Sequence, residues 1–459
     1  MFNKIVALYS DREYFNNVFK IALPIIFQQF VYALLNMLGV VFVGQKGDTA
    51  VAAVGLAGQI AFLLNLVHFG IISGAAMFTA QFWGRQDIPN LKRVLGLCLM
   101  FAISASAVFF AISQFVPEWF LGIYSKDPDV IAMGAEYVRT FSWTFLFMAV
   151  SASYVFVMRS TGSVKLPTYV SVGVLSLNTL LSYVLIFGYF GMPEMGVQGA
   201  AVAAVIARAL ECVILLYVIY AYKFPVAASI KELTDFDLAF TARVIKPMLP
   251  VMLNELFWSL GITTYNAIYG RMGTEALATV NIVSPIEQIA FVVFVGLANA
   301  TSVLVGNRIG AGKDDEAYLY GGRSIGLGIA GGVLLGLLLQ IFKVPALSLF
   351  NVSSEVLQNA SVMVNIVSIF LWVRVNNMTI VVGILRAGGD TRFSLFLDGI
   401  IIWLVGVPFA ALGAFYFHLP VYFVYLCVMS EEVTKWILGI FRWRSRKWIH
   451  NLASQMEGI

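Results

Sequence analysis

The chain has 459 residues, of which 60% are hydrophobic and only 12% charged, with a net charge of +4 and a mean hydropathy of +0.86. Soluble globular domains carry about twice that share of charged residues. The composition therefore excludes a soluble enzyme and a disordered chain, and the small, dispersed positive charge excludes a nucleic-acid partner. Cys98, Cys212 and Cys427 are too widely spaced for a disulfide framework or a metal knuckle.

Apolar runs long enough to cross a bilayer recur along the chain, since about 20 apolar residues make a spanning helix. Runs this long favour helices over the short alternating strands of a barrel. The sequence therefore predicts an all-α polytopic membrane protein with twelve transmembrane helices. The predicted spans are 20–43, 50–80, 94–116, 130–158, 168–190, 197–222, 244–269, 276–305, 321–342, 355–386, 393–415 and 420–443. Before them, Tyr14–Lys20 is interpreted as a short amphipathic helix on the membrane surface.

Basic residues concentrate in alternate connections between the predicted helices. Of the 29 Lys and Arg, 21 lie in the two terminal segments and in every second connection, and only four lie in the other connections. Connections rich in Lys and Arg stay on the cytoplasmic side. We therefore expect a multi-pass protein of the plasma (inner) membrane with both termini cytoplasmic, which agrees with an even number of spans.

The second half of the chain repeats features of the first half. A shift of 226 residues places Pro24 on Pro250, and a shift of 227 places Arg159 on Arg386. We expect two pseudo-symmetric six-helix bundles: an N-terminal lobe (1–222), a cytoplasmic linker (223–243) and a C-terminal lobe (244–459). Transporters built from such repeats bind substrate between the halves and rock one half against the other.

Glu255 lies about ten residues into the seventh predicted helix, in LPVMLNELFWSLG. An acid at this depth costs roughly 2.5–3.5 kcal/mol on insertion scales and is a functional candidate by default. We expect an unpaired carboxyl that takes up H⁺ or binds Na⁺ as a metal ligand, with Asn254 beside it. The structural alternative is a neutral carboxyl hydrogen-bonded to Asn254.

Two further acids are candidates for cation coupling. Asp398 lies in FSLFLDGIIIW of the eleventh helix, and Glu287 follows Pro285 in the eighth. Proline frees a backbone carbonyl, which together with a carboxylate suits a hard cation. The structural alternatives are an Asp398 paired with Arg392 or Arg386, and a local kink at Glu287. All of these acids are in the second half, where we therefore expect ion coupling.

Other polar and aromatic residues of the predicted helices are expected to line the interior. A secondary polar cavity is predicted from Asn36, Asn178, Asn376, Asn377 and Arg374. Aromatic rings attract flat organic cations, and the predicted substrate-lining residues are Tyr32, Trp258, Tyr265 and Trp403. Arg374 has no acid nearby in sequence, so we expect it to meet one across the bundle.

The ordered motifs of the chain resemble those of the MATE (multidrug and toxic compound extrusion) family over about residues 20–447. The motifs are VFVGQKGDTAVAAVGLA and SLNTLLSYVLIFGYFGMPEMGVQGAA in the first half, and LPVMLNELFWSLG, IYGRMGTEALA, VGNRIGAGKDDEA and GILRAGGDTRF in the second. The resemblance implies antiport of organic, often cationic, compounds out of the cell, driven by Na⁺ or H⁺. We expect no cofactor beyond the coupling ion, and membrane lipid and a small organic substrate as partners. A two-lobed monomer suffices mechanically, so a monomer is expected.

The chain departs from the DinF-like, proton-linked branch of that family in its first half. That branch has an aspartate three residues after an asparagine in the first helix, where Asn36 is followed here by Gly39. It has another aspartate four residues after an asparagine in the fifth helix, where Asn178 is followed here by Ser182. The first-half proton site of that branch is therefore missing.

The chain also departs from the NorM-like branch. The glutamate of that branch in helix seven is matched by Glu255, but its aspartate in helix ten is replaced by Asn376 or Asn377. We therefore expect Asp398 or Glu287 to act as the partner of Glu255.

The predicted function is a Na⁺- or H⁺-coupled antiporter that exports organic compounds by alternating access, and not an enzyme. A lipid or polyprenyl-linked-sugar flippase of the same superfamily is the alternative. It needs a strongly cationic cavity for a diphosphate, and Arg139, Arg208 and Arg374 are few for that. A membrane-embedded enzyme needs catalytic clusters and a channel needs a filter loop, and the sequence shows neither.

Overall fold

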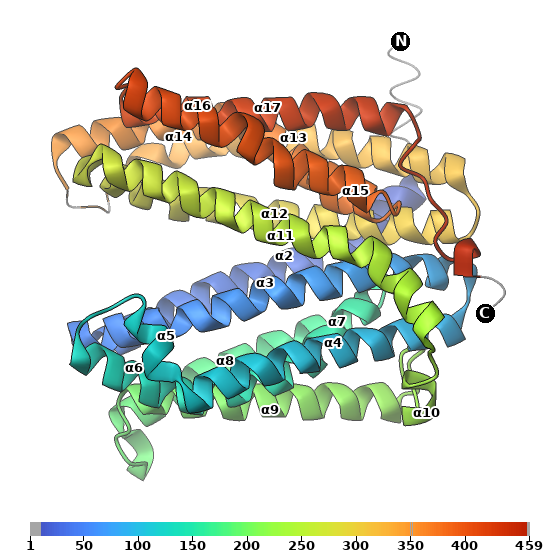
Figure 1. Cartoon of the computed structure of the whole chain (residues 1–459), viewed down its shortest axis with the longest axis horizontal. Helices are drawn as coiled ribbons and strands as arrows, with labels where there is room; N and C mark the ends of the chain where they lie inside the picture. Colours follow the sequence, from blue (N-terminus) through green and yellow to red (C-terminus); the bar gives the residue numbers. More distant parts are fainter. Residues whose placement is uncertain (1–10, 349, 351, 457–459) are drawn as a thin grey trace. The chain divides into compact units, whose positions relative to one another are not determined.

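The structure is a computed structural model that describes residues 11–348, 350 and 352–456. These residues form helices joined by short connections and contain no β-strand, which confirms the predicted all-α fold (Figure 1). The two chain ends that we expect in the cytoplasm, residues 1–10 and 457–459, lie outside the described range.

Helices cover the predicted spans of the first half, with one interruption in the fourth span. The helices are α2 (Arg12–Gly44), α3 (Asp48–Arg85), α4 (Ile88–Phe115), α6 (Pro128–Phe141), α7 (Trp143–Ser160), α8 (Lys165–Phe187) and α9 (Val197–Ala221), with the short α5 (Pro117–Gly122). The fourth predicted span is interrupted at Ser142, between α6 and α7.

The second half follows the same plan. Its elements are α11 (Leu238–Met272), α12 (Thr274–Gly310), α13 (Asp314–Leu347), α14 (Ser354–Met378), η2 (Thr379–Arg386), α15 (Thr391–Ser394), η3 (Leu395–Ile400), η4 (Ile402–Gly406), α16 (Val407–Ala411), η5 (Leu412–Tyr416) and α17 (Val421–Arg444). The segments η2, η3, η4 and η5 are π-helical. The sequence did not indicate these wider turns. π-Helical turns are rare in proteins overall, and those that occur are often at functional sites.

Ten helical runs among the described residues are long and apolar enough to cross a membrane. The two remaining long helices are α11 and α17, and these carry Asn254 and Glu255, and Glu431, Glu432 and Lys435, respectively. The two long helices outside this set therefore carry many of the polar groups discussed below.

The interpretation of Tyr14–Lys20 as a separate surface helix is wrong. These residues form the first turns of α2, which begins at Arg12. Tyr14 and Val18 are buried, and the Tyr14 hydroxyl lies 2.7 Å from Oγ of Ser324 in α13. The apolar face of this segment packs against protein, so it does not lie free on the membrane surface.

The described chain divides into two compact units. The C-unit contains the residues up to Ile26, Ala80–Gln86 and the chain from Ala242 onward, and the N-unit contains Phe27–Thr79 and Asp87–Thr241. The start of α2 and the end of α3 thus pack with the second half of the chain. In this respect the units differ from the lobes expected at 1–222 and 244–459.

The expected linker 223–243 contains the short helix α10 (Ile230–Leu233), which lies against α4 within the N-unit. Glu232 receives a hydrogen bond from the Lys92 ammonium at 2.7 Å. Together with the backbone and hydroxyl of Ser229, this contact lowers the pKa of Glu232 to about 2. The carboxylate form is therefore favoured wherever the pH is above that value, and the contact is lost only in strong acid.

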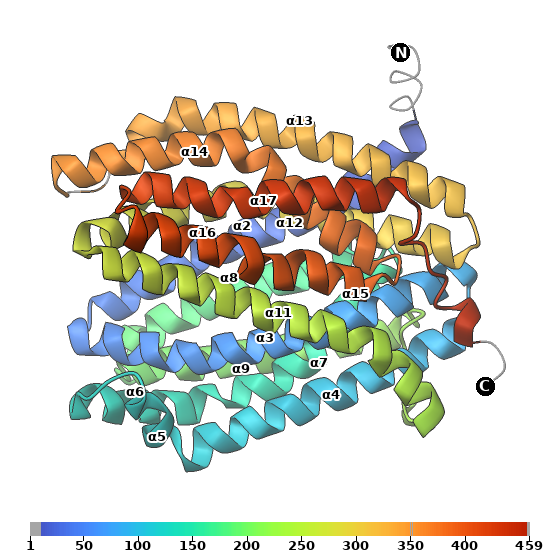
Figure 2. The ribbon, with the colours of Figure 1, turned by 45° about the horizontal axis from the view of Figure 1, so that its top comes forward.

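Helices α13, α14 and α17 run side by side in the C-unit (Figures 1 and 2). Glycines allow α13 to approach α14 closely, because a Cβ on Gly332 would lie 2.4 Å from Cα of Trp372 and one on Gly336 would lie 2.3 Å from the carbonyl oxygen of Ser368. Small residues at such spacing are how membrane helices pack tightly. This packing fixes α14, which carries Arg374 and Asn377.

Gly332→Ala is expected to lower the thermal stability of the protein in detergent, since overpacking costs about 1–3 kcal/mol. The matched control is Gly331→Ala, whose Cβ would lie 3.5 Å from Cε1 of Phe294, an ordinary contact. Thermal unfolding followed by tryptophan fluorescence measures both variants. Equal melting temperatures for the two would contradict the close approach of α13 and α14.

Candidate functional site

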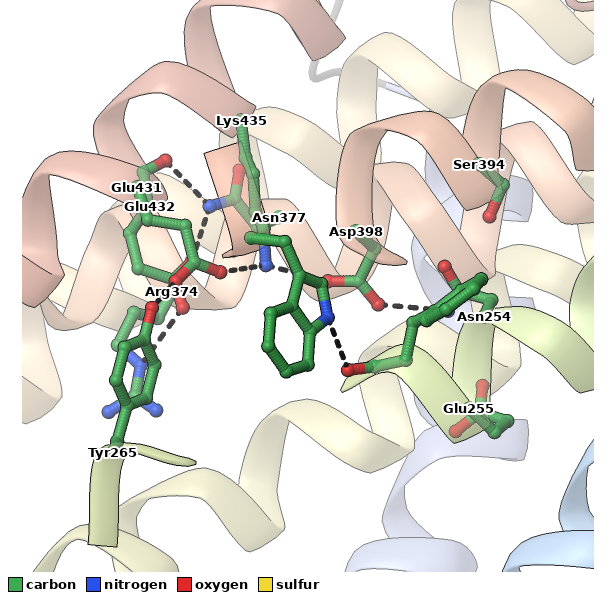
Figure 3. A network of polar contacts seen from close by, with 12 residues as sticks. Asn254, Glu255, Tyr265, Arg374, Asn377, Ser394, Asp398, Glu431, Glu432 and Lys435 are labelled. Carbon is green, nitrogen blue, oxygen red and sulfur yellow. Dashed lines mark hydrogen bonds and ion pairs between the residues drawn. The ribbon is translucent and has the colours of Figure 1, made fainter. Parts of the chain in front are cut away.

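A nearly buried lysine of α17 connects three helical elements of the C-unit. The side chain of Lys435 is 2% exposed, and its Nζ lies 2.9 Å from Oδ1 of Asp398 in η3 and also pairs with Glu431, one turn earlier in α17. Nδ2 of Asn254 donates to Oδ2 of Asp398 at 3.0 Å, and the Tyr265 hydroxyl donates to Glu431. We name these five residues the Lys435 group (Figure 3).

A second group is arranged around Arg374 of α14. Its guanidinium pairs with Glu287 of α12, and its Nε lies 3.6 Å from Oε1 of Glu432 in α17. Nδ2 of Asn377 donates to Oε2 of Glu432 at 2.6 Å, and the Tyr425 hydroxyl donates to Oε1 of Glu287 at 3.0 Å. We name these five residues the Arg374 group. The expectation that Arg374 meets an acid across the bundle is confirmed.

Glu255 is not an unpaired acid, and that expectation is wrong. Its Oε1 lies 2.7 Å from Nη2 of Arg386, and both side chains are almost fully buried. Arg386 ends the π-helical η2, and its Nε also donates to Oγ of Ser394 at 3.4 Å. Arg386 is the last residue of the span predicted at 355–386, and the π-helical turn, which is continuous with α14, holds its guanidinium inside the C-unit.

The partners expected for the other acids also differ. Asp398 forms its ion pair with Lys435 at 2.9 Å, and Arg386 acts on it as a further nearby positive charge. Among the described residues, no hydrogen bond or ion pair joins Glu255 to Asp398 or Glu287; Asn254, its neighbour in sequence, bonds to Asp398 instead. These contacts do not test whether Glu255 couples ion movement to transport. They show that Arg386 balances the negative charge of the Glu255 carboxylate.

The charges of this site do not balance. Five carboxylates and three bases belong to it: Glu255, Glu287, Asp398, Glu431 and Glu432 with Arg374, Arg386 and Lys435. The Glu255–Arg386 pair is neutral, whereas the other two groups each contain two carboxylates and one base. With every group ionised, each of these two carries one excess negative charge in a partly buried setting, where uncompensated charge is costly.

The remaining polar residues of the predicted cavity fall into both units. In the C-unit, Asn376 is buried and its Nδ2 donates to the carbonyl oxygen of Trp372 at 2.8 Å. Asn36 and Asn178 belong to the N-unit, where Asn36 is exposed and Asn178 is half-buried. A single cavity that includes all of them remains a prediction.

The four aromatic residues predicted to line the substrate path differ in exposure. Tyr32, Trp258 and Trp403 are exposed, and Nε1 of Trp403 donates to the carbonyl oxygen of Phe257 at 3.1 Å. Tyr265 is buried and bonded to Glu431. In this structure three of the four rings are therefore accessible, and the fourth belongs to the Lys435 group.

Sequence reasoning missed Glu431, Glu432 and Lys435 as site residues. The available signal was the stretch MSEEVTKW, in which Glu431 and Lys435 are spaced as ion-pairing neighbours within an otherwise apolar helix. Such a cluster in a predicted span is itself a reason to expect function.

No group of three or more His, Cys, Asp or Glu in the described part of the chain is arranged to hold a metal ion. The C-unit nevertheless offers carboxylate and amide oxygens, which are the ligands of hard cations. A transition-metal centre therefore has no support from the described residues, whereas a site for a proton or an alkali cation fits their chemistry.

The N-unit repeats one contact of the site with a neutral amide in place of the carboxylate. Nη2 of Arg159 donates to Oε1 of Gln28 at 2.8 Å. Arg159 is the position that the internal repeat aligns with Arg386, and Gln28 precedes the position aligned with Glu255. The repeated arginine thus contacts the first helix of its half in both units, but only the C-unit uses a carboxylate for it.

Long apolar helices, an internally repeated chain and an intramembrane charged network together define a polytopic membrane transporter. Comparison with known families specifies the class. The family model MatE matches residues 24–184 and again 250–412, one match in each half. The chain therefore belongs to the MATE family of multidrug efflux transporters.

Relatives and solved structures agree with this assignment. The chain is 25% identical to "Uncharacterized transporter YisQ" of Bacillus subtilis, over 97% of this chain and 98% of that protein. It is 24% identical to "Probable multidrug resistance protein NorM" of Thermotoga maritima, over 94% and 92% of the two chains. Its fold is similar to that of the Vibrio cholerae MATE transporter VcmN in the bent form, with a TM-score of 0.86, 19% identity and coverage of 96% and 98%.

Glu255→Gln is expected to destabilise the protein by about 3–5 kcal/mol, because it leaves the buried guanidinium of Arg386 without its carboxylate. The double variant Glu255→Gln/Arg386→Gln is expected to recover much of that loss. Thermal unfolding in detergent measures stability, and ion-driven transport is measured on the same preparations.

The two readouts separate two roles of Glu255. A double variant that is stable and transports shows that the pair is structural. A double variant that is stable but inactive shows that Glu255 or Arg386 has a transport role of its own. A single variant as stable as the parent protein would contradict the buried ion pair.

Proposed function

We propose that this protein is a secondary antiporter that exports organic, cationic compounds in exchange for Na⁺ or H⁺. The proposed location is the plasma (inner) membrane, with both termini cytoplasmic and a monomer as the working form. The names of relatives such as the Thermotoga NorM, a probable multidrug resistance protein, support the substrate class. The distribution of basic residues supports the orientation.

The observation that carries the proposal is the excess of negative charge in the C-unit. The Lys435 group and the Arg374 group each lack one positive charge when all their members are ionised. A proton or an alkali cation supplies that charge from either side of the membrane. An organic cation can compete for the same charge, and this competition is what an exchange mechanism needs.

The cycle follows from differential affinity. In an outward-open state, H⁺ or Na⁺ binds to the carboxylates and weakens the attraction for the cationic substrate, which leaves to the outside. The protein then opens inward, the ion leaves, and the restored negative charge attracts a new substrate. The ion drives the exchange only to the extent that it binds the two states with different affinity.

The alternative of a lipid or polyprenyl-diphosphate flippase gains no support from the C-unit. A diphosphate is recognised by converging cations. Each base of the site is instead already paired with carboxylates, and the balance of charge is negative. Transport of a short-chain fluorescent lipid would support the flippase and contradict the antiporter.

Asp398→Asn is expected to reduce gradient-driven efflux at least about tenfold, which corresponds to a loss of roughly 1.4 kcal/mol of coupling. The purified protein is reconstituted into vesicles, and the vesicles are loaded with a cationic fluorescent dye. A Na⁺ gradient is imposed in one experiment and a pH gradient in another. The matched control is Asp315→Asn, an exposed carboxylate that pairs with Arg446 at 2.6 Å.

The same vesicles test the proposal as a whole. Dye movement that accelerates under one of the two gradients and is lost in Asp398→Asn supports antiport. Dye movement that is independent of both gradients, or movement of the fluorescent lipid instead of the dye, would rule it out.

A further inference from the structure

The Lys435 group and the Arg374 group have the same design. In each, one base lies between two carboxylates that come from two different elements: Lys435 contacts Asp398 of η3 and Glu431 of α17, and Arg374 contacts Glu287 of α12 and Glu432 of α17. Glu431 and Glu432 are neighbours in sequence, so α17 supplies one carboxylate to each group.

Each group also contains one asparagine with the same arrangement of contacts. The amide nitrogens of Asn254 and Asn377 donate to carboxylates, Asp398 in the first group and Glu432 in the second. The two side chains are 0% and 5% exposed. Their amide oxygens are buried and have no hydrogen-bond partner among the described residues.

A buried acceptor without a partner is costly, so two such oxygens at equivalent places call for a ligand. The missing partner must be positive or carry a hydrogen, because it lies beside a carboxylate that is in excess. An alkali cation satisfies both oxygens by coordination, since carboxylate and amide oxygens are ligands of hard cations. A proton on the carboxyl supplies an O–H that can donate to the amide oxygen, and in Asp398 the oxygen that takes the proton gives up its present donor, Lys435 or the Asn254 amide.

We propose that the C-unit binds two monovalent coupling ions in each transport cycle, Na⁺ or H⁺, one in the Lys435 group and one in the Arg374 group. This inference rests on the proposed function and specifies its stoichiometry. Each ion brings one group to neutrality: two carboxylates, one resident base and one transported cation. Lys435 and Arg374 each neutralise one of the two carboxylates in their group. Each group therefore needs one ion for neutrality instead of two.

The neutral Glu255–Arg386 pair takes no part in this count. Its carboxylate already has a guanidinium at 2.7 Å, and it lacks the second acid that creates the excess in the other groups. The stoichiometry is therefore determined by α17 and its partners and not by the single acid of α11.

The test is the ratio of coupling ions to substrate, measured at zero membrane potential in vesicles. Valinomycin and equal K⁺ on both sides hold the membrane potential at zero. For a fixed gradient of the coupling ion, we then record the dye gradient at which the net flux of dye stops. An ion gradient of about tenfold balances a dye gradient of about 100-fold if two ions are exchanged per dye, and of about tenfold if one is exchanged. One series uses a Na⁺ gradient at uniform pH, and the other uses a pH gradient without Na⁺.

Two variants assign the ions to the two groups. Glu431→Gln and Glu432→Gln each remove the excess charge of one group and leave its base paired with one carboxylate, so each is expected to reduce the ratio from two to one. The double variant is expected to lose ion-driven accumulation. The matched control is Glu316→Gln, because Glu316 lies at the surface and pairs with Arg308 and Lys313.

A second readout applies if a variant transports too slowly for a flux measurement. Binding of an ion to the folded state raises the melting temperature. The rise produced by Na⁺ over choline, or by lowering the pH without Na⁺, is expected to be smaller in each single variant than in the parent protein and absent in the double variant.

The outcomes distinguish this inference from the proposed function. A parent ratio of one, or a ratio of two that persists in both single variants, would overturn the two-ion assignment and leave the antiporter intact. Dye flux that responds to neither gradient in the parent protein would instead remove the proposed function itself.

Discussion

The structure depends on how charge is compensated inside the C-unit. A lysine and an arginine of the helical core each lie between two carboxylates of different elements, and a second arginine is paired with one. Removing ionised groups from water is expensive unless they are paired and hydrogen-bonded. These contacts therefore offset the cost of burying the charges, and removing one partner destabilises the folded chain. In the two groups with two carboxylates and one base, one negative charge stays uncompensated.

The same contacts connect the ion to helix positions. The Lys435 group touches α11 at Asn254 and at Tyr265, three turns and about 16 Å apart along the helix axis, and joins it to η3 and α17. The Arg374 group joins α12, α14 and α17. Neutralising either group changes the attraction between helices that belong to the same unit. In the proposed cycle, this change in attraction links ion binding to conformation.

Much of the fold could be predicted from the sequence, because continuous apolar runs determine where membrane helices form. The predicted spans all fall on helical segments. Arg374 was expected to meet an acid on another helix, and that acid is Glu287. The sequence could not show where side chains meet between helices. Asn254 and Asp398 are 144 residues apart and Lys435 and Asp398 are 37 apart, and nothing local to any of them indicates the contact.

The failures have physical causes as well. Glu255 was expected to be unpaired, whereas the π-helical η2 carries Arg386 inside the unit to its carboxylate. Tyr14 was assigned to an amphipathic surface helix, whereas its side chain is buried and its hydroxyl lies against Ser324 of α13. In both cases the partner that decides the position is distant in sequence.

The central claim is that carboxylates of the C-unit change their charge state or their ligand when the coupling ion binds. Infrared difference spectroscopy on purified protein, comparing Na⁺ with choline at several pH values, observes these groups directly. The account predicts difference bands of carboxylates on adding Na⁺, or of protonated carboxyls on lowering the pH, and their loss when Glu431 and Glu432 are both replaced by Gln. Spectra that show no carboxyl change under either condition would contradict it, because the resident bases would then compensate the acids permanently.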